Sequence, residues 1–137
     1  MTRYLLDTNV ISELRKTRPH GAVVAWLEKL RVEQIFLSSV TMGELQMGVE
    51  LTRRQDPAKA HEIESWLTSV EMSFAFIPMD SACFREWSRI MAGKPAGLRE
   101  DAMIAATALV HGLTVATRDE KDFKHFGVEI INPFKSN

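Results

Sequence analysis

The stretch Tyr4-Leu5-Leu6-Asp7-Thr8-Asn9-Val10-Ile11 holds the pattern that decides the fold. Tyr4-Leu5-Leu6 is the short apolar run of a buried strand, and a helical stretch from Val10 to Lys16 follows it until Arg18-Pro19 stops the helix. An acid, Asp7, stands where the strand gives way to the helix. Because a buried strand needs neighbours beside it and helices over both of its faces, this unit predicts an α/β sandwich.

The same order of strand and helix recurs along the rest of the chain. Further strands are predicted at 35–37, 74–77, 114–116 and 128–131, and further helices at 22–30, 40–49, 57–70, 81–92 and 101–111. Short apolar strands separated by helices are typical of a parallel sheet. No linker-like or repeated segment interrupts the pattern. We therefore expect one α/β domain over residues 1–137.

Composition excludes several classes of protein. Hydrophobic residues make up 45% and charged residues 26% of the 137 residues, which is the balance of a globular domain and not of a disordered or fibrous chain. The formal net charge of −1 gives no overall basic field, so a nucleic acid would have to be bound locally. The single cysteine, Cys83, can form neither an internal disulfide nor a cysteine-based metal cage, and we expect it to be a small buried residue.

The compartment is expected to be the cytoplasm. One cysteine fits a reducing environment. The first residues reach Asp7 before an apolar signal region can build up, and the longest nearly apolar stretch, Ala102 to Val110, is far shorter than a membrane span.

Two acids directly follow predicted strands. Asp7 follows the first strand, and Asp119 comes just after the fourth. Ligands of parallel sheets bind at the carboxyl ends of the strands. If these two strands are neighbours, both carboxylates face one crevice.

Two further acids lie on apolar stripes of predicted helices. Asp101 shares its stripe with Ile104, Ala105 and Ala108, and Glu44 lies between Val40 and Gly48 on another helix. Burying an unpaired charge is costly, and no Lys or Arg lies on either stripe. A divalent cation is the simplest partner, and carboxylates without clustered His or Cys favour Mg²⁺ or Mn²⁺ over zinc.

Simpler structural roles are also open for three of these acids. Asp7 and Asp101 each precede a predicted helix and can act as N-caps. Asp119 can be a turn residue within Arg118-Asp119-Glu120-Lys121. Glu44 is in mid-helix, where neither role is available, although a slight rotation of the helix would expose it. Four such coincidences together are less plausible than one site.

Four segments of the chain, in order, resemble the motifs of PIN-domain ribonucleases of the VapC type. The ending Asn132-Pro133-Phe134 is also similar to that family, and the resemblance covers essentially the whole chain. The four segments are Leu5-Leu6-Asp7-Thr8-Asn9-Val10-Ile11-Ser12-Glu13, Leu37-Ser38-Ser39-Val40-Thr41-Met42-Gly43-Glu44-Leu45, Asp101-Ala102-Met103-Ile104-Ala105-Ala106-Thr107-Ala108 and Val115-Ala116-Thr117-Arg118-Asp119.

The resemblance implies a PIN-like three-layer sandwich, in which helices flank a central five-stranded parallel sheet. It also implies a Mg²⁺- or Mn²⁺-dependent endoribonuclease that hydrolyses RNA, often tRNA or rRNA, by metal-activated water. The catalytic and metal-binding acids then fall on Asp7, Glu44, Asp101 and Asp119. Asn9 and Thr117 match positions that support the site by hydrogen bonding. Asp122 is a fallback for Asp119, and Glu100 has no assigned role.

The resemblance further implies a toxin of a toxin–antitoxin pair. Its partners would be RNA, a VapB-type antitoxin and a second copy of the chain in a homodimer. With the antitoxin it would form a heterotetramer or a larger assembly, and operator DNA would be bound only through the antitoxin. Eight basic residues near the predicted crevice are candidates for phosphate contacts. They are Arg15, Lys16, Arg18, Lys94, Arg99, Arg118, Lys121 and Lys124.

Two other functions stay open. One is a non-catalytic PIN-like interaction module, in which the acids bind metal or a partner's arginines. The other is a metal-dependent phosphatase. Asp7-Thr8-Asn9 lacks the second aspartate of an Asp-x-Asp phosphatase motif, which counts against that function.

Overall fold

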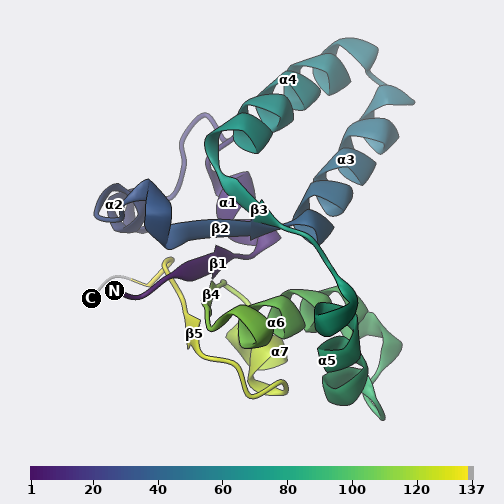
Figure 1. Cartoon of the computed structure of the whole chain (residues 1–137). Coiled ribbons are helices and arrows are strands. Elements are labelled where there is room, and N and C mark those ends of the chain that lie inside the picture. The colour runs from purple at the N-terminus through teal and green to yellow at the C-terminus, as the bar shows by residue number, and fades with distance from the viewer. Residues whose placement is uncertain (136–137) are drawn as a thin grey trace.

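A computed structural model describes residues 1–135, and its centre is a parallel five-stranded sheet of order β3-β2-β1-β4-β5 (Figure 1). The expected fold class is confirmed. The strands are β1 (Tyr4–Leu6), β2 (Ile35–Ser38), β3 (Ala75–Ile77), β4 (Thr114–Ala116) and β5 (Ile130–Ile131). The expected single domain over 1–137 extends past the described part and stays a prediction.

Helices cover both faces of the sheet. The α-helices are α1 (Thr8–Glu13), α2 (Gly21–Glu28), α3 (Ser39–Arg53), α4 (Pro57–Ser73), α5 (Ser81–Met91), α6 (Arg99–His111) and α7 (Glu120–Lys124). In the described part of the chain, one short 3-10 turn, η1 (Val32–Gln34), leads from α2 to β2, and another, η2 (Ala96–Leu98), lies between α5 and α6. No helix within residues 1–135 is both long enough and apolar enough to cross a membrane.

Successive residues of β1 point into two different cores. Leu5 packs with α6, α7 and the partly buried side of α5, whereas Leu6 packs with α1, α2 and the end of α4. This alternation is the two-residue period of a strand that is buried on both faces. The result is the expected three-layer sandwich, with α5, α6 and α7 below the sheet in Figure 1 and α1, α2 and α4 on its other side.

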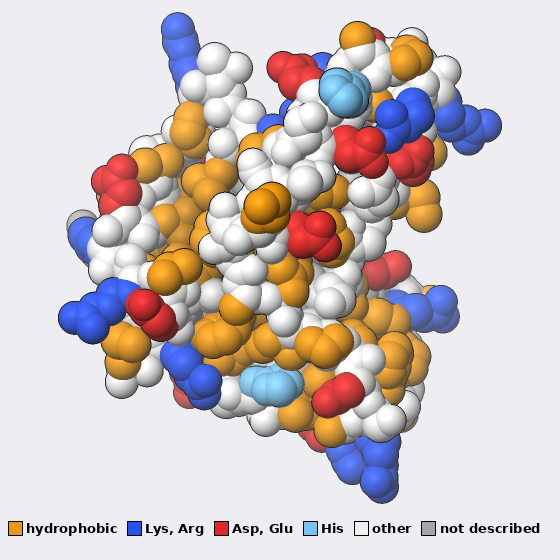
Figure 2. All heavy atoms as spheres, turned by 45° about the horizontal axis from the view of Figure 1, so that its top comes forward, with side chains coloured by type: hydrophobic (Ala, Val, Ile, Leu, Met, Phe, Trp, Pro, Cys, Tyr) orange, Lys and Arg blue, Asp and Glu red, His pale blue; other side chains and the backbone are white. Residues whose placement is uncertain are grey.

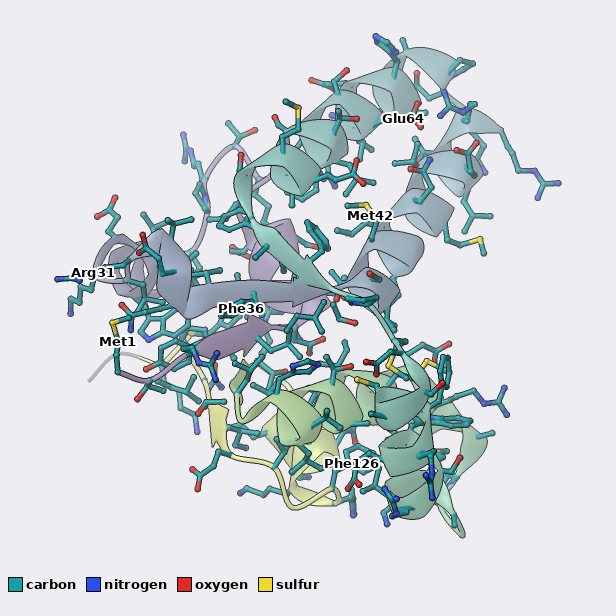
Figure 3. The ribbon with its side chains drawn as sticks, viewed as in Figure 1. Met1, Arg31, Phe36, Met42, Glu64 and Phe126 are labelled. Atoms are coloured by element: carbon teal, nitrogen blue, oxygen red, sulfur yellow. The ribbon has the colours of Figure 1, made fainter. Side chains whose placement is uncertain are left out.

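Helices α3 and α4 form a hairpin that extends away from the sheet (Figure 1). Its own small core contains Val49 and Leu67, and Met42 lies between the two helices (Figure 3). Nη2 of Arg53 lies 2.8 Å from Oε1 of Glu64, which ties the end of α3 to α4. The base of this hairpin carries Glu44 towards the sheet edge.

Two local features differ from the sequence-based expectation: the start of α1 and the presence of a helix after β4. Asp7 caps α1, so that helix begins at Thr8 and not at the expected Val10. The segment after β4 was interpreted as a turn, but it forms α7, a five-residue helix. A helix this short shows no apolar periodicity, and the burial of Phe123 against the core holds it in place.

Candidate metal site and active site

The first and fourth strands are neighbours, as the placement of the acids required. Leu6 of β1 lies opposite Ala116 of β4, and the backbone N–H of Asp7 donates to the carbonyl oxygen of Ala116 at 2.9 Å. The chain turns to β2 on one side of β1 and returns to β4 on the other side. Asp7 and Thr117 therefore lie at the switch point of the sheet, where parallel α/β folds bind ligands.

Asp7 is a buried carboxylate fixed by three donors. Its Oδ2 accepts from Oγ1 of Thr117 at 2.7 Å and from Nδ2 of Asn9 at 3.1 Å, and its Oδ1 accepts from the N–H of Thr8 at 2.8 Å. Burial raises the pKa of Asp7, although these three hydrogen bonds act in the opposite direction. Asp7 is the N-cap of α1, as the simpler structural role required. Capping does not account for its further hydrogen bonds to Thr117 and Asn9.

Glu44 reaches the site from α3, but it is not on the buried side of that helix. The buried positions of α3 are Thr41 and Val49, and Glu44 is exposed, so the expectation of an inward-facing Glu44 is wrong. The apolar stripe is rotated by about one residue from the expected one. Oε1 of Glu44 accepts from Oγ1 of Thr8 at 3.0 Å, so Thr8 links Glu44 to Asp7.

The charges of the neighbouring acids also act on Glu44. Partial desolvation raises its pKa, and the negative charges of Asp7 and Glu100 raise it further. Glu100, which had no assigned role, therefore adds to the negative charge around Glu44.

Asp101, Asp119 and Asp122 form a compact acidic group. One carboxylate oxygen from each residue lies within 4.8 Å of the others, and all three side chains are partly buried. Asp101 is in the first turn of α6, whose N-cap is Leu98, so the alternative role of Asp101 as an N-cap is wrong. Asp119 occupies the N-cap position of α7 and makes no side-chain capping bond there within the described chain.

The carboxylates repel one another strongly. Burial raises the pKa of Asp101 to about 7, together with the charges of Asp7, Asp119, Asp122 and Glu44. Burial and the neighbouring Asp122 also raise the pKa of Asp119. Without a cation, this group holds a proton close to neutral pH.

A divalent cation fits the donors of this site. The compact group offers oxygen ligands only, which suits a hard ion such as Mg²⁺ or Mn²⁺. A positive ion would also remove the repulsion that raises the pKa of Asp101. The group of three does not include Asp7 or Glu44. Their negative charges act on Asp101, and hydrogen bonds connect Glu44 to Asp7 through Thr8 and Asp7 to the backbone of Asp119 through Thr117.

Thr117 and Asn9 lie where supporting residues were expected. Oγ1 of Thr117 donates to Asp7 and accepts from the backbone N–H of Asp119 at 2.8 Å, so one hydroxyl joins two of the acids. Asn9 donates to Asp7 and accepts from the backbone N–H of Arg118 at 3.2 Å. These contacts fix both amide and hydroxyl orientations.

Two residues of the site were underrated or missed. Asp122 was only a fallback, yet it lies in the acidic group beside Asp119. The spacing of three residues would have placed both acids on one side of a helix, had α7 been recognised. Thr8 links Asp7 and Glu44, and its sequence position beside Asp7 gave no signal of that role.

The basic residues on the face shown in Figure 2 do not form one continuous patch. On the face shown in Figure 2, Lys and Arg side chains lie in separate groups near the outline, with hydrophobic side chains between them. Lys16 and Arg118 both approach the carboxylate of Glu13, at 2.8 and 3.6 Å. Phosphate contacts by these residues stay a prediction. Cys83 is buried, as expected.

A parallel sheet with acids gathered near its switch point defines an α/β domain with a candidate metal site. The chain belongs to the PIN domain family, which matches residues 4–129.

Similar proteins also support membership of the PIN domain family, and they match nearly the full chain. The VapC ribonuclease Y4jK of Sinorhizobium fredii is 36% identical, with 96% of this chain and 97% of that protein covered. The toxin FitB of Neisseria gonorrhoeae is 38% identical, with 95% and 97% covered. The crystal structure of FitAcB from Neisseria gonorrhoeae superimposes with a TM-score of 0.86, at 37% identity and with 96% and 98% of the chains covered. Other structures of similar fold include a toxin–antitoxin complex from Klebsiella pneumoniae and FitAB bound to a DNA fragment.

Proposed function

We propose that this PIN-domain protein is a divalent-metal-dependent endoribonuclease and the toxin of a toxin–antitoxin pair. The named ribonuclease and toxin among its relatives support the activity and the biological role. The proposed catalytic and metal-binding residues are Asp7, Glu44, Asp101 and Asp119, and Asp122 joins them. The phosphatase alternative has no support from these relatives.

The observation that carries this proposal is the compact group of Asp101, Asp119 and Asp122, whose carboxylate oxygens lie within 4.8 Å of one another. Burial and the neighbouring negative charges raise the pKa of Asp101 to about 7, and such a group is costly to keep as structure alone. An acidic group of this kind is useful where a protein must bind a cation that neutralises the charge of RNA. Perturbed acids of this kind concentrate at functional sites.

Each residue of the site has a distinct part in the proposed chemistry. A bound Mg²⁺ or Mn²⁺ would promote ionisation of a water molecule and offset the charge that develops on the phosphate. Asp101, Asp119 and Asp122 would hold the ion, since their oxygens lie within 4.8 Å of one another. Asp7 would be held in one orientation by its three donors. Glu44, exposed on α3 and held by Thr8, would supply a further carboxylate for the ion or its water.

Water would attack phosphorus in line and the P–O3′ bond would break, with O3′ leaving as the hydroxyl, so the products would carry a 3′-hydroxyl and a 5′-phosphate. The substrate is proposed to be tRNA or rRNA. We further propose that the protein acts in the cytoplasm as a homodimer. It would form a heterotetramer or larger assembly with a VapB-type antitoxin, through which it would meet operator DNA.

The test is cleavage of total tRNA and rRNA by the antitoxin-free protein in Mg²⁺ or Mn²⁺. Discrete cuts are expected for the wild type and for Glu71→Gln, a control that neutralises an exposed acid on α4. Asp7→Ala and EDTA should each abolish the cuts. Intact RNA with the wild type under all metal conditions would instead favour a non-catalytic interaction module.

A further inference from the structure

The residues Asn132-Pro133-Phe134 form a short segment after β5 that contacts the residues on either side of Asp119. They lie beyond residues 4–129, which the family pattern matches. After β5 the chain runs back past the sheet, and Phe134 packs against the core formed with α1 and α2 (Figure 1). Pro133 is buried. The proposed function gives this segment no task.

Phe134 and Glu13 hold the side chain of Arg118 from two directions. The guanidinium carbon of Arg118 lies 4.0 Å from the centre of the Phe134 ring, and Nη2 of Arg118 lies 3.6 Å from Oε2 of Glu13. A guanidinium over an aromatic face is attracted to the ring. The ring of His20 meets Phe134 edge-on, with 5.3 Å between the ring centres.

Glu13 is a buried anchor for this arrangement. It is 4% exposed, which is unusual for a carboxylate. Its oxygens accept from the backbone N–H of His20 at 2.8 Å and from Nζ of Lys16 at 2.8 Å, in addition to the contact with Arg118. Glu13 and Phe134 thus contact the otherwise exposed side chain of Arg118, and His20 packs on Phe134. We name these four residues the Arg118 clasp.

A second contact of the same segment holds the other side of Asp119. Nδ2 of Asn132 donates to Oε2 of Glu120 at 3.0 Å, and the side-chain oxygen of Asn132 accepts from the backbone N–H of Phe134 at 3.0 Å. Nζ of Lys135 also lies 2.6 Å from Oε2 of Glu120. The segment therefore contacts both neighbours of Asp119 in the chain: Phe134 contacts Arg118, and Asn132 contacts Glu120.

The backbone of Arg118 connects the clasp to the acids. Its N–H donates to Oδ1 of Asn9 at 3.2 Å, and Nδ2 of Asn9 donates to Oδ2 of Asp7 at 3.1 Å. The carbonyl of the Asn9 amide is thereby held towards Arg118, which leaves its NH₂ for the carboxylate. A displaced Arg118 would release the amide to rotate, and Asp7 would lose one of its three donors.

We infer that Phe134 and Glu13, acting through Arg118 and Asn9, are positioning residues for the carboxylates of the metal site. This inference rests on the proposed function for its consequence in catalysis, but not for its consequence in metal binding. Residues that orient metal ligands from outside typically change metal affinity by about 10- to 100-fold when they are replaced.

The decisive variant is Phe134→Leu, which keeps an apolar side chain but removes the ring. We expect the side-chain amide resonances of Asn9 to shift or broaden in the metal-free protein, as measured by ¹⁵N-edited NMR. We also expect Mn²⁺ affinity, measured by calorimetry, to fall by about 10-fold. Phe134→Trp, which keeps a ring for the guanidinium, should restore both values towards the wild type.

Phe36→Leu is the matched control. Phe36 is also partly buried and also lies beneath a guanidinium, with Arg3 5.8 Å from its ring centre (Figure 3). It lies on β2, and Arg3 precedes β1 at the opposite end of the strand from Asp7. This control should lower the melting temperature without changing the Asn9 resonances or the Mn²⁺ affinity.

The outcomes separate this inference from the proposed function. If Phe134→Leu only lowers the melting temperature, as Phe36→Leu does, the clasp is structural and the inference is overturned. If Phe134→Leu does not fold, Arg118→Gln replaces it, because it removes the cation and leaves Phe134 in place, and the same shift and affinity loss are required. If both readouts change as expected while wild-type protein leaves RNA intact, the inference stands and the proposed nuclease function fails.

Discussion

Replacing Asp101 by Asn should stabilise the metal-free protein at neutral and higher pH. The pKa of Asp101 rises from 3.8 to about 7, because the carboxylate is partly buried and faces Asp7, Glu44, Asp119 and Asp122. Each pKa unit is worth about 1.4 kcal/mol, so a full ionisation of Asp101 would cost the folded state at most about 4 kcal/mol. Solvent around this partly exposed group screens the repulsion, and we expect a gain of about 2 kcal/mol for Asp101→Asn.

The gain should depend on pH in a defined direction. The folded state binds the Asp101 proton more tightly than the unfolded chain, so unfolding releases a proton between about pH 4 and pH 7. The stability of the metal-free wild type therefore falls as pH rises through this window, and acidification restores it. The difference between Asp101→Asn and wild type should be largest near pH 8 and small near pH 4.

Thermal unfolding in EDTA measures this difference. For a chain of 137 residues, about 2 kcal/mol corresponds to roughly 7 °C in melting temperature. Saturating Mg²⁺ should reverse the order, because the wild type gains binding energy that the variant has lost. Glu71→Gln serves as the charge-matched control on α4 and should show neither effect. If Asp101→Asn is equally or less stable than wild type in EDTA at pH 8, carboxylate repulsion does not govern this site.

Three further changes have expected outcomes. Thr117→Val removes the hydroxyl that joins Asp7 to the backbone of Asp119, so Mn²⁺ affinity should fall by about 10-fold or more in calorimetry, and Thr117→Ser should retain most of it. Gly112→Ala should lower the free energy of unfolding in urea by about 1–2 kcal/mol, because Gly112 ends α6 in the left-handed conformation at φ 66°. The loss should not be larger, since a Cβ at this position meets no atom within 4 Å. Leu67→Ala should cost about 2–5 kcal/mol by leaving a cavity in the α3–α4 hairpin, while Mn²⁺ affinity stays unchanged.

The order of elements could be predicted because short apolar strands and amphipathic helices leave clear periodicities. Thr114–Ala116 was predicted with its observed bounds, and the helix that Pro57 begins was also correct. The errors lie where tertiary packing outweighs local pattern. The predicted strand 128–131 shortens to Ile130–Ile131, because only these residues pair with β4. Helix α7 was missed because its stability comes from the buried ring of Phe123 and not from its own length.

The candidate site was predicted in part. Asp7, Asp101 and Asp119 could be selected because strand ends and a buried helix face are visible in the sequence, and the structure places each beside other acids. Glu44 was selected for the wrong reason, since it faces outward and reaches the site through Thr8. Glu13 and Phe134 lie in segments that resemble the family, but the sequence does not show that both contact Arg118. Glu13 is more than a hundred positions from Arg118, so only the fold brings the two together.

The layers of this protein and the residue types of its site follow from its local sequence patterns. Alternation along β1 sends Leu5 and Leu6 into opposite cores, and acids placed at strand ends require a parallel sheet to bring them together. Which acids lie close enough to raise one another's pKa depends on the tertiary structure. The order of the strands puts Asp7 beside Thr117, and the packing of α6 and α7 brings Asp101 to Asp119 and Asp122. Electrostatic coupling falls with distance through space and not along the chain, so the raised pKa of Asp101 exists only in the folded protein.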